Sequence, residues 1–141
     1  MTQITLAQAN EIIAGAFAKG REAGFKPLSV AVVDAGGHLI AFARQDGASF
    51  ARAQIATGKA AGALALGVSS RKVGAMAEER PWFIGAFASS APHPVIPAAG
   101  GVIVVAGGAF IGAVGVTGET SDNDEIAALA GIAAAGLTAQ G

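Results

Sequence analysis

The chain has 141 residues, of which 52% are hydrophobic and only 6% aromatic, with 21 glycines and no cysteine. The missing cysteines exclude disulfides, thiolate metal sites and a cysteine nucleophile, and the balance of 9 basic against 10 acidic residues leaves no basic stripe for nucleic acid. With so few aromatic rings, the core has to be built from small aliphatic side chains, with glycines that let backbones approach closely.

The first predicted helix begins at a capping box, with Thr5 as the N-cap and Gln8 as the third helical residue. Apolar residues then recur at helical spacing and predict one buried face: Leu6, Ala9, Ile13, Ala16 and Phe17. Glycines at positions 20 and 24 end this helix. Residues 28–33 are predicted to form an apolar strand, Asp34-Ala-Gly-Gly37 a turn, and residues 38–44 the returning strand.

Small side chains dominate the middle of the chain. Ser49 is the expected N-cap of a helix that runs to about Gly67, and Ser69 or Ser70 begins a shorter helix that must end before Pro81. Residues 82–99 contain three prolines and are predicted to form a loop.

Residues 98–117 carry no charge and are long enough to span a bilayer. Six glycines interrupt them and no basic anchor flanks them, so we expect no membrane segment. The stretch from Val102 to Ile111 instead predicts two strands around a Gly107-Gly108 turn. Thr120 or Ser121 then caps a last helix. Its expected inward residues are Ile126, Leu129, Ile132 or Ala133, and Leu137.

This order of helices and hairpins predicts a single α+β domain over residues 1–141, with an antiparallel sheet flanked by helices. Sparse charge, at 13% of residues, favours a homo-oligomer, and Trp82-Phe83 beside Pro81 is interpreted as a subunit contact. The N-terminus lacks the pattern of a secretory signal, so a cytoplasmic location is expected.

Glycine-rich and metal-binding motifs give little support for a nucleotide or metal site. The run Gly112-Ala-Val-Gly-Val-Thr-Gly118 is followed by Glu119, where a phosphate loop needs lysine. The only histidines, His38 and His93, lack a second strong ligand at helical spacing, so no protein metal site is expected. Each is a surface or capping residue, or alternatively one axial ligand to haem.

Charged residues supply the other candidates. Lys59 shares a helix face with small and apolar residues; it is a desolvated base, imine-forming nucleophile or carboxylate anchor, or else a lysine that extends its ammonium to water. Arg44, Asp46 and Arg52 cluster after the first hairpin, where they bind a ligand carboxylate or only tie the turn together. Asp34 is explained more simply as a turn former.

Three blocks of sequence resemble the haem-degrading family of GlcG-like and HbpS-like proteins, which also forms the C-terminal part of PduO-type proteins. The blocks are Val33-Asp-Ala-Gly-Gly-His-Leu39 with Arg44-Gln-Asp-Gly-Ala48, Ile55-Ala-Thr-Gly-Lys-Ala60, and Gly100-Gly101 leading to Gly112-Ala-Val-Gly-Val-Thr-Gly118. The similarity covers essentially the whole chain. The chain departs from the family at Gln45, where methionine is frequent, and at Val102-Ile103, where Pro-Ile is frequent.

The resemblance implies a profilin-like sheet flanked by helices and a dimer-based assembly of four to eight subunits. It also implies a small-molecule ligand, with haem or a related tetrapyrrole the first to test. The residues it implicates are Asp34, Arg44, Asp46, Lys59, Gly100 and Gly101. We expect a ligand pocket that combines Lys59, Arg44 and the Gly100-Gly101 backbone. The alternative is a cofactor-independent catabolic enzyme for a small carboxylate-bearing or aromatic-derived substrate, with Lys59 as its base or nucleophile.

Overall fold

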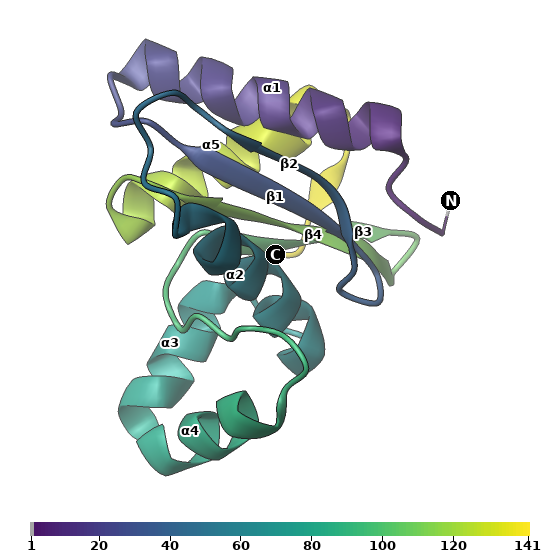
Figure 1. Ribbon diagram of the computed structural model, residues 1–141. Helices are drawn as coiled ribbons and strands as arrows, with labels where there is room; N and C mark the ends of the chain where they lie inside the picture. The colour runs from purple at the N-terminus through teal and green to yellow at the C-terminus, as the bar shows by residue number, and fades with distance from the viewer. Residues whose placement is uncertain (1) are drawn as a thin grey trace.

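The structure, a computed structural model, describes residues 2–141 and confirms the predicted α+β class (Figure 1). The elements in chain order are α1 (Leu6–Ala23), β1 (Ser29–Asp34), β2 (Leu39–Arg44), α2 (Arg52–Leu66), α3 (Ser70–Glu79), α4 (Pro81–Ser90), β3 (Gly101–Ala106), β4 (Ala109–Thr117), α5 (Ser121–Ala134) and β5 (Thr138–Ala139).

The strands form one antiparallel sheet in the order β2-β1-β4-β3-β5. Both predicted hairpins are confirmed as neighbouring strand pairs, and β1 joins them by pairing with β4 from Ser29↔Thr117 to Asp34↔Gly112. Helices α1 and α5 cover one face of the sheet and α2 covers the other (Figure 1). Helices α3 and α4 extend away from the sheet beyond α2.

The hydrophobic core is divided by the sheet into two clusters. The larger one, beneath α1 and α5, includes the fully buried Ile12, Val30, Val114 and Ile132. The smaller one, beneath α2, consists of Val33, Ala60, Ala63, Ile103 and Ala113. Beneath α2 the side chains are small because the helix lies almost directly on the sheet backbone. A Cβ atom at Gly115 would stand 2.9 Å from the carbonyl carbon of Ala56.

Helix α4 shows that the predicted loop over residues 82–99 is wrong in its first half. Pro81 occupies the first turn of α4, where its missing N–H and fixed φ are harmless, so it begins a helix here as well as ending α3. Only the stretch after Ser90, which holds the three prolines, lacks helix or strand.

Two expectations about side chains are also corrected. Ser49 is not the N-cap of α2, because Ala51 holds that position and the Ser49 hydroxyl instead accepts a hydrogen bond from Arg52 Nε at 3.0 Å. Ile126 and Leu129 are 44% and 42% exposed, since the face of α5 that meets α1 is built from smaller residues. That face includes Ala127, Ala128 and Gly131.

The remaining helix ends agree with the sequence. The capping box at Thr5 and the caps at Ser69 and Thr120 all form, and Gly24 and Gly67 close their helices in the left-handed conformation. Within residues 2–141, no helix has the length and apolar character needed to cross a membrane. Much of the uncharged stretch 98–117 is used in β3 and β4.

Candidate functional site

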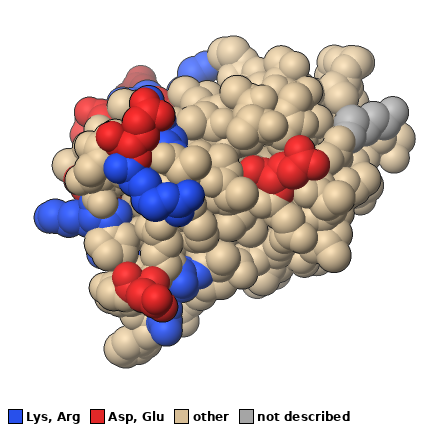
Figure 2. All heavy atoms as spheres, turned by 90° about the horizontal axis from the view of Figure 1, so that it is seen from above, with Lys and Arg blue, Asp and Glu red and all other residues tan. Residues whose placement is uncertain are grey.

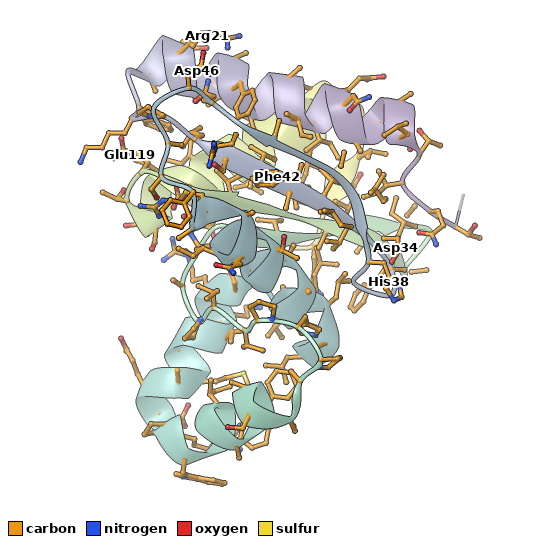
Figure 3. The ribbon with its side chains drawn as sticks, viewed as in Figure 1. Arg21, Asp34, His38, Phe42, Asp46 and Glu119 are labelled. Atoms are coloured by element: carbon orange, nitrogen blue, oxygen red, sulfur yellow. The ribbon has the colours of Figure 1, made fainter. Side chains whose placement is uncertain are left out.

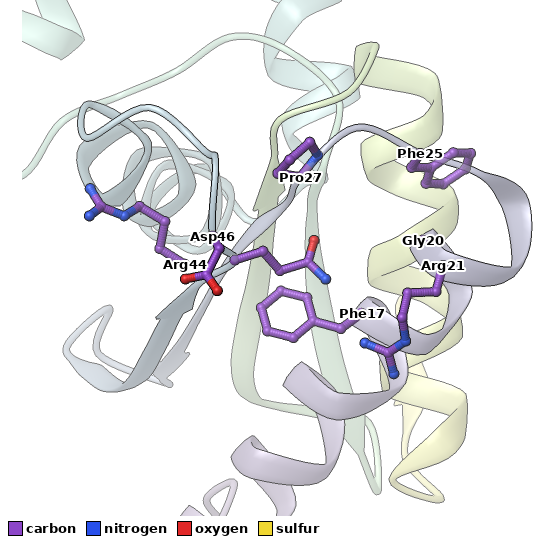
Figure 4. A pocket seen from close by; sticks show the side chains of 8 residues that line it. Phe17, Gly20, Arg21, Phe25, Pro27, Arg44 and Asp46 are labelled. Carbon is purple, nitrogen blue, oxygen red and sulfur yellow. The ribbon is translucent and has the colours of Figure 1, made fainter.

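A cavity of about 520 Å³ lies where the end of α1 meets the end of β2 (Figure 4). The lining residues are Phe17, Gly20 and Arg21 of α1, Phe25 and Pro27 of the following loop, and Arg44, Gln45 and Asp46 at the end of the first hairpin. Figure 4 shows Arg44 and Asp46 on one side of the cavity and the α1 residues on the other. The cavity therefore contains two of the predicted ligand-binding residues.

Glycines in and after α1 shape one wall of this cavity. Gly24 ends α1 with φ of +73°, a conformation that favours glycine, and reverses the chain into Phe25. A Cβ atom at Gly20 would stand 2.9 Å from Leu28 Cδ1, so the missing side chain lets the returning chain lie against the helix. As a result, Phe25 and Pro27 stand beside Phe17 and Arg21 in three dimensions.

Gln45 fixes the other wall. Its side-chain oxygen accepts a hydrogen bond from the backbone N–H of Leu28 at 2.7 Å, and its own backbone N–H donates to the Leu28 carbonyl at 2.9 Å. Both bonds tie the end of β2 to the start of β1. A thioether accepts hydrogen bonds only weakly, so glutamine gives this chain a firmer connection than the methionine frequent in the family.

The charged residues that line the cavity form no ion pairs in the described part of the chain. Within residues 2–141, no ion pair involves Arg21, Arg44 or Asp46. The alternative that Arg44 and Asp46 only tie the turn together stays a prediction, and no ion pair between them supports it. Arg52 is not part of this set, because it donates to Ser49 Oγ and, at 2.9 Å, to Thr117 Oγ1. Figure 2, which looks down on α1, shows charged side chains gathered mainly at one end of that face.

Lys59 lies in the interior. Its Nζ atom is 3.0 Å from Asp124 Oδ2 and donates at 3.0 Å to the carbonyl of Val116, and the two charged side chains are 3% and 2% exposed. The other carboxylate oxygen of Asp124 accepts from the backbone N–H of Glu119 at 2.9 Å. The idea that Lys59 extends its ammonium to water is thus wrong, and Asp124 is a partner that the sequence did not reveal.

Burial acts on both members of this pair. It lowers the pKa of the Lys59 ammonium and raises the pKa of the Asp124 carboxyl, while the attraction between the charges opposes both shifts. Gly100 and Gly101 adjoin the pair, while ligand binding by these glycines stays a prediction. A Cβ atom at Gly100 would stand 2.9 Å from Lys59 Nζ, and one at Gly101 would stand 2.6 Å from the Lys59 carbonyl carbon. Both glycines leave room that the lysine and its helix occupy.

The predicted pocket shared by Lys59, Arg44 and the Gly100-Gly101 backbone does not form. Arg44 belongs to β2 at the edge of the sheet, and β1 separates β2 from β4, whose Val116 binds the Lys59 ammonium. Lys59 also lines none of the four cavities characterised within residues 2–141. The enzyme hypothesis based on Lys59 therefore stays a prediction, without a cavity to support it.

Asp34 and His38 lie together at the opposite end of the hairpin from Asp46 (Figure 3). Asp34 Oδ1 accepts hydrogen bonds from the backbone N–H groups of Gly36 at 2.9 Å and His38 at 3.0 Å. The His38 side chain is 83% exposed, and its Nδ1 atom is 3.4 Å from the same carboxylate oxygen. Burial opposes the shift, but these hydrogen bonds lower the pKa of Asp34. The turn-forming role of Asp34 is confirmed, while ligand binding by this pair stays a prediction.

His93 is separate from both places. Its Nδ1 atom is 2.9 Å from the carbonyl oxygen of Pro94. Pro94 belongs to a segment that packs on α2, and α2 covers the opposite face of the sheet from α1. Within the described part of the chain, no cluster of three histidine, aspartate or glutamate side chains is placed to hold a metal ion.

The sequence missed the α1 side of the 520 Å³ cavity, because Phe17 and Arg21 are unremarkable positions on an amphipathic helix.

Solved structures share this fold over nearly the whole chain. A double mutant of HbpS from Streptomyces reticuli is 30% identical, with a TM-score of 0.82 over 94% of this chain and 87% of that one. Klebsiella pneumoniae protein ORFY is 27% identical, with a TM-score of 0.85 over 96% and 93%. A PduOC:heme complex is 21% identical, with a TM-score of 0.86 over 99% of both chains, and shows likeness of fold.

The family comparison agrees with the structural one. Curated protein sequences give no match. The family model described as haem degrading protein HbpS-like matches residues 4–133, which include every element except α5's last residue and β5. The resemblance seen in the three sequence blocks is thereby confirmed, and the chain belongs to the HbpS-like family of haem-degrading proteins.

Proposed function

We propose that this chain binds haem or a closely related tetrapyrrole in the cavity between α1 and the end of β2. Membership of the HbpS-like family supports a haem-related ligand, and one similar structure is a haem complex. The observation that carries the proposal is the lining of the cavity, which combines aromatic rings with the Arg21 guanidinium, a group that forms no ion pair with any carboxylate of the described chain.

The ring of a porphyrin fits the apolar part of this lining. Phe17, Phe25 and Pro27 offer flat hydrophobic surfaces, and the volume of about 520 Å³ falls within the usual range for small-molecule sites. An aromatic ligand gains both from burial and from contacts between its ring and those of phenylalanine. These residues would exclude water from one part of the ring and set its orientation.

The carboxylates of a tetrapyrrole fit the polar part. Arg21 presents its guanidinium group at the α1 side of the cavity, and a guanidinium binds a carboxylate through two parallel hydrogen bonds. Asp46 is the only acidic residue of the lining. When bound, haem would supply a redox-active iron; the chain's own part is to hold the ring and the carboxylates.

The test is a titration of the protein with haemin followed by the Soret absorbance. We expect saturable binding to the wild type, and Arg21→Ala should weaken it about tenfold, because a charge-assisted hydrogen bond contributes roughly 1.5–3 kcal/mol. Arg80→Ala is the matched control, since Arg80 is exposed beside Phe83 at the start of α4. Absence of saturable binding, or an equal effect of both variants, would overturn the proposal.

We further propose that the chain forms a homo-oligomer, as its sparse charge suggested, and that it resides in the cytoplasm. The exposed Trp82 and Phe50, at 70% and 87%, support self-association, because large apolar side chains on a surface favour contacts with another protein.

A further inference from the structure

The cavity offers no side chain of the kinds that normally hold haem iron. Haem proteins bind iron through histidine, cysteine, methionine or tyrosine, and the lining residues of this cavity include none of these. Arginine has no free lone pair for a metal, and the side-chain oxygen of Gln45 is already bound to the N–H of Leu28. Asp46 is left as the one anionic oxygen donor.

The histidines lie elsewhere in the fold. His38 is at the far end of β2 from Asp46 (Figure 3), and Asp34 stands beside its ring. His93 lies next to Pro94, which packs against Gly58 of α2 on the opposite face of the sheet from α1. Met76 belongs to α3, which extends beyond α2. Neither histidine nor Met76 is placed to reach iron in this cavity from the same chain.

We infer that the cavity recognises the ring and the carboxylates of a tetrapyrrole and does not require its iron. This inference rests on the proposed function and narrows it to a ligand class, the dicarboxylate porphyrins with or without a metal. A metal-free porphyrin presents the same rings to Phe17 and Phe25 and the same carboxylates to Arg21. It should therefore bind about as tightly as haemin.

The experiment compares haemin, metal-free protoporphyrin and protoporphyrin dimethyl ester by equilibrium dialysis against the full chain. We expect the dissociation constants of haemin and metal-free protoporphyrin to lie within about threefold of each other, because the protein forms no bond to the iron that could favour haemin. The dimethyl ester should bind at least tenfold more weakly because it has lost its carboxylates. Arg21→Ala should weaken haemin and free porphyrin equally.

The outcomes separate this inference from the proposed function. If haemin binds and free porphyrin binds more than tenfold more weakly, the iron is recognised and the inference fails while the proposed function stands. If neither binds, the proposed function itself fails. His38→Ala, His93→Ala and Asp46→Asn give a second reading. A change in the Soret band of bound haemin in any one of them would show ligation by this chain or by a neighbouring copy, and would overturn the inference.

Added imidazole provides a spectroscopic check on the complex of the wild-type protein with haemin. Iron without a protein ligand keeps both axial positions open, so imidazole should shift the Soret band as it does for free haemin. A bound haemin whose spectrum resists imidazole would already have strong axial ligands and would contradict the inference.

Discussion

The Lys59–Asp124 pair is a buried contact between two oppositely charged side chains. It joins α2 to α5 in the interior, and the ammonium also binds the carbonyl of Val116 while the carboxylate also binds the N–H of Glu119. Removing charge from water is costly, so such a pair is tolerated only when its hydrogen bonds are satisfied. These partners satisfy that condition.

We predict that Lys59→Met destabilises the chain by about 3–5 kcal/mol, because it leaves the Asp124 carboxylate buried without a counter-charge. The double variant Lys59→Met with Asp124→Leu should recover most of that loss. Urea unfolding followed by circular dichroism measures both. Lys72→Met is the matched control, since Lys72 is exposed. A neutral effect of Lys59→Met would show that the pair is not needed for stability.

Asp34 should make part of the stability dependent on pH. Its pKa is lowered in the folded protein, so its contribution is present above the ordinary carboxyl pKa and is lost as the pH falls through the folded value. Asp34→Asn keeps an oxygen acceptor for the turn but cannot titrate. Between pH 6 and pH 3 the wild type should lose more stability than this variant, and urea unfolding at a series of pH values measures the difference. Glu78→Gln, an exposed substitution, should follow the wild type.

Individual residues show how far the sequence can predict the candidate site. Arg44 and Asp46 were found because they follow a recognisable hairpin, and both line the cavity. Arg21 and Phe25 could not be found, because nothing local reveals that the end of α1 folds back beside that hairpin. Asp124 lies in the first turn of α5, where the helix dipole favours an acidic residue whatever else it contacts. A lysine on a helix face of small residues indicates that an acidic partner is needed. The sequence does not show which residue that partner is, because several acidic residues lie close to Asp124 along the chain.

At the scale of elements, the contact between α2 and the sheet is unusually direct. A Cβ atom at Gly115 would stand 2.9 Å from the carbonyl carbon of Ala56 and 3.1 Å from the N atom of Ala60. These are backbone atoms, which cannot rotate away as the end of a side chain can. The separation of helix and sheet is therefore set by glycine at this point.

We predict opposite effects for two glycine-to-alanine substitutions. Gly115→Ala should destabilise the chain by about 3 kcal/mol or more, because α2 would have to move off the sheet. Gly85→Ala should stabilise it by about 0.5–1 kcal/mol, since Gly85 lies within α4 with nothing within 4 Å of the added methyl group. Thermal unfolding followed by circular dichroism distinguishes them. A small effect of Gly115→Ala would show that the α2 contact is looser than described.

Most elements were predictable because their ends carry strong local signals, such as the capping box at Thr5 and the Gly107-Gly108 turn. Helix α4 was missed because Pro81 was interpreted only as the end of α3, although proline is also favoured in the first turn of a helix. The two-residue strand β5 gave no signal at all. It forms because the chain after α5 returns along β3, which is decided by tertiary packing.

At the scale of the whole molecule, the α3–α4 pair extends from the layered body and exposes apolar surface. Only Ile84 of α4 is buried, whereas Trp82 at its start is 70% exposed. Trp82 is the single tryptophan of the chain. Its fluorescence therefore reports on α4 without any label.

We predict that concentrating the protein shifts the tryptophan emission to shorter wavelength, as a second copy covers α4 and removes Trp82 from water. Ala86→Glu should abolish that shift and reduce the mass seen by analytical ultracentrifugation, because it places a charge on exposed α4 surface. Ala14→Glu, on an exposed position of α1, is the control. A monomer at every concentration would contradict the prediction, and an oligomer unaffected by Ala86→Glu would place the contact elsewhere.

The small side chains beneath α2 have a consequence for the entropy of folding. Alanine and glycine have no rotamers to lose, whereas ordering a leucine or isoleucine costs about 0.5–1 kcal/mol. Much of the contact made by Ala56, Ala60, Ala63, Gly101 and Gly115 is thus formed without freezing any side-chain torsion. The cost falls on the backbone instead, because glycine is the residue that loses most main-chain freedom. The side of the molecule under α2 should therefore have few alternative packings and respond to substitution as a rigid unit.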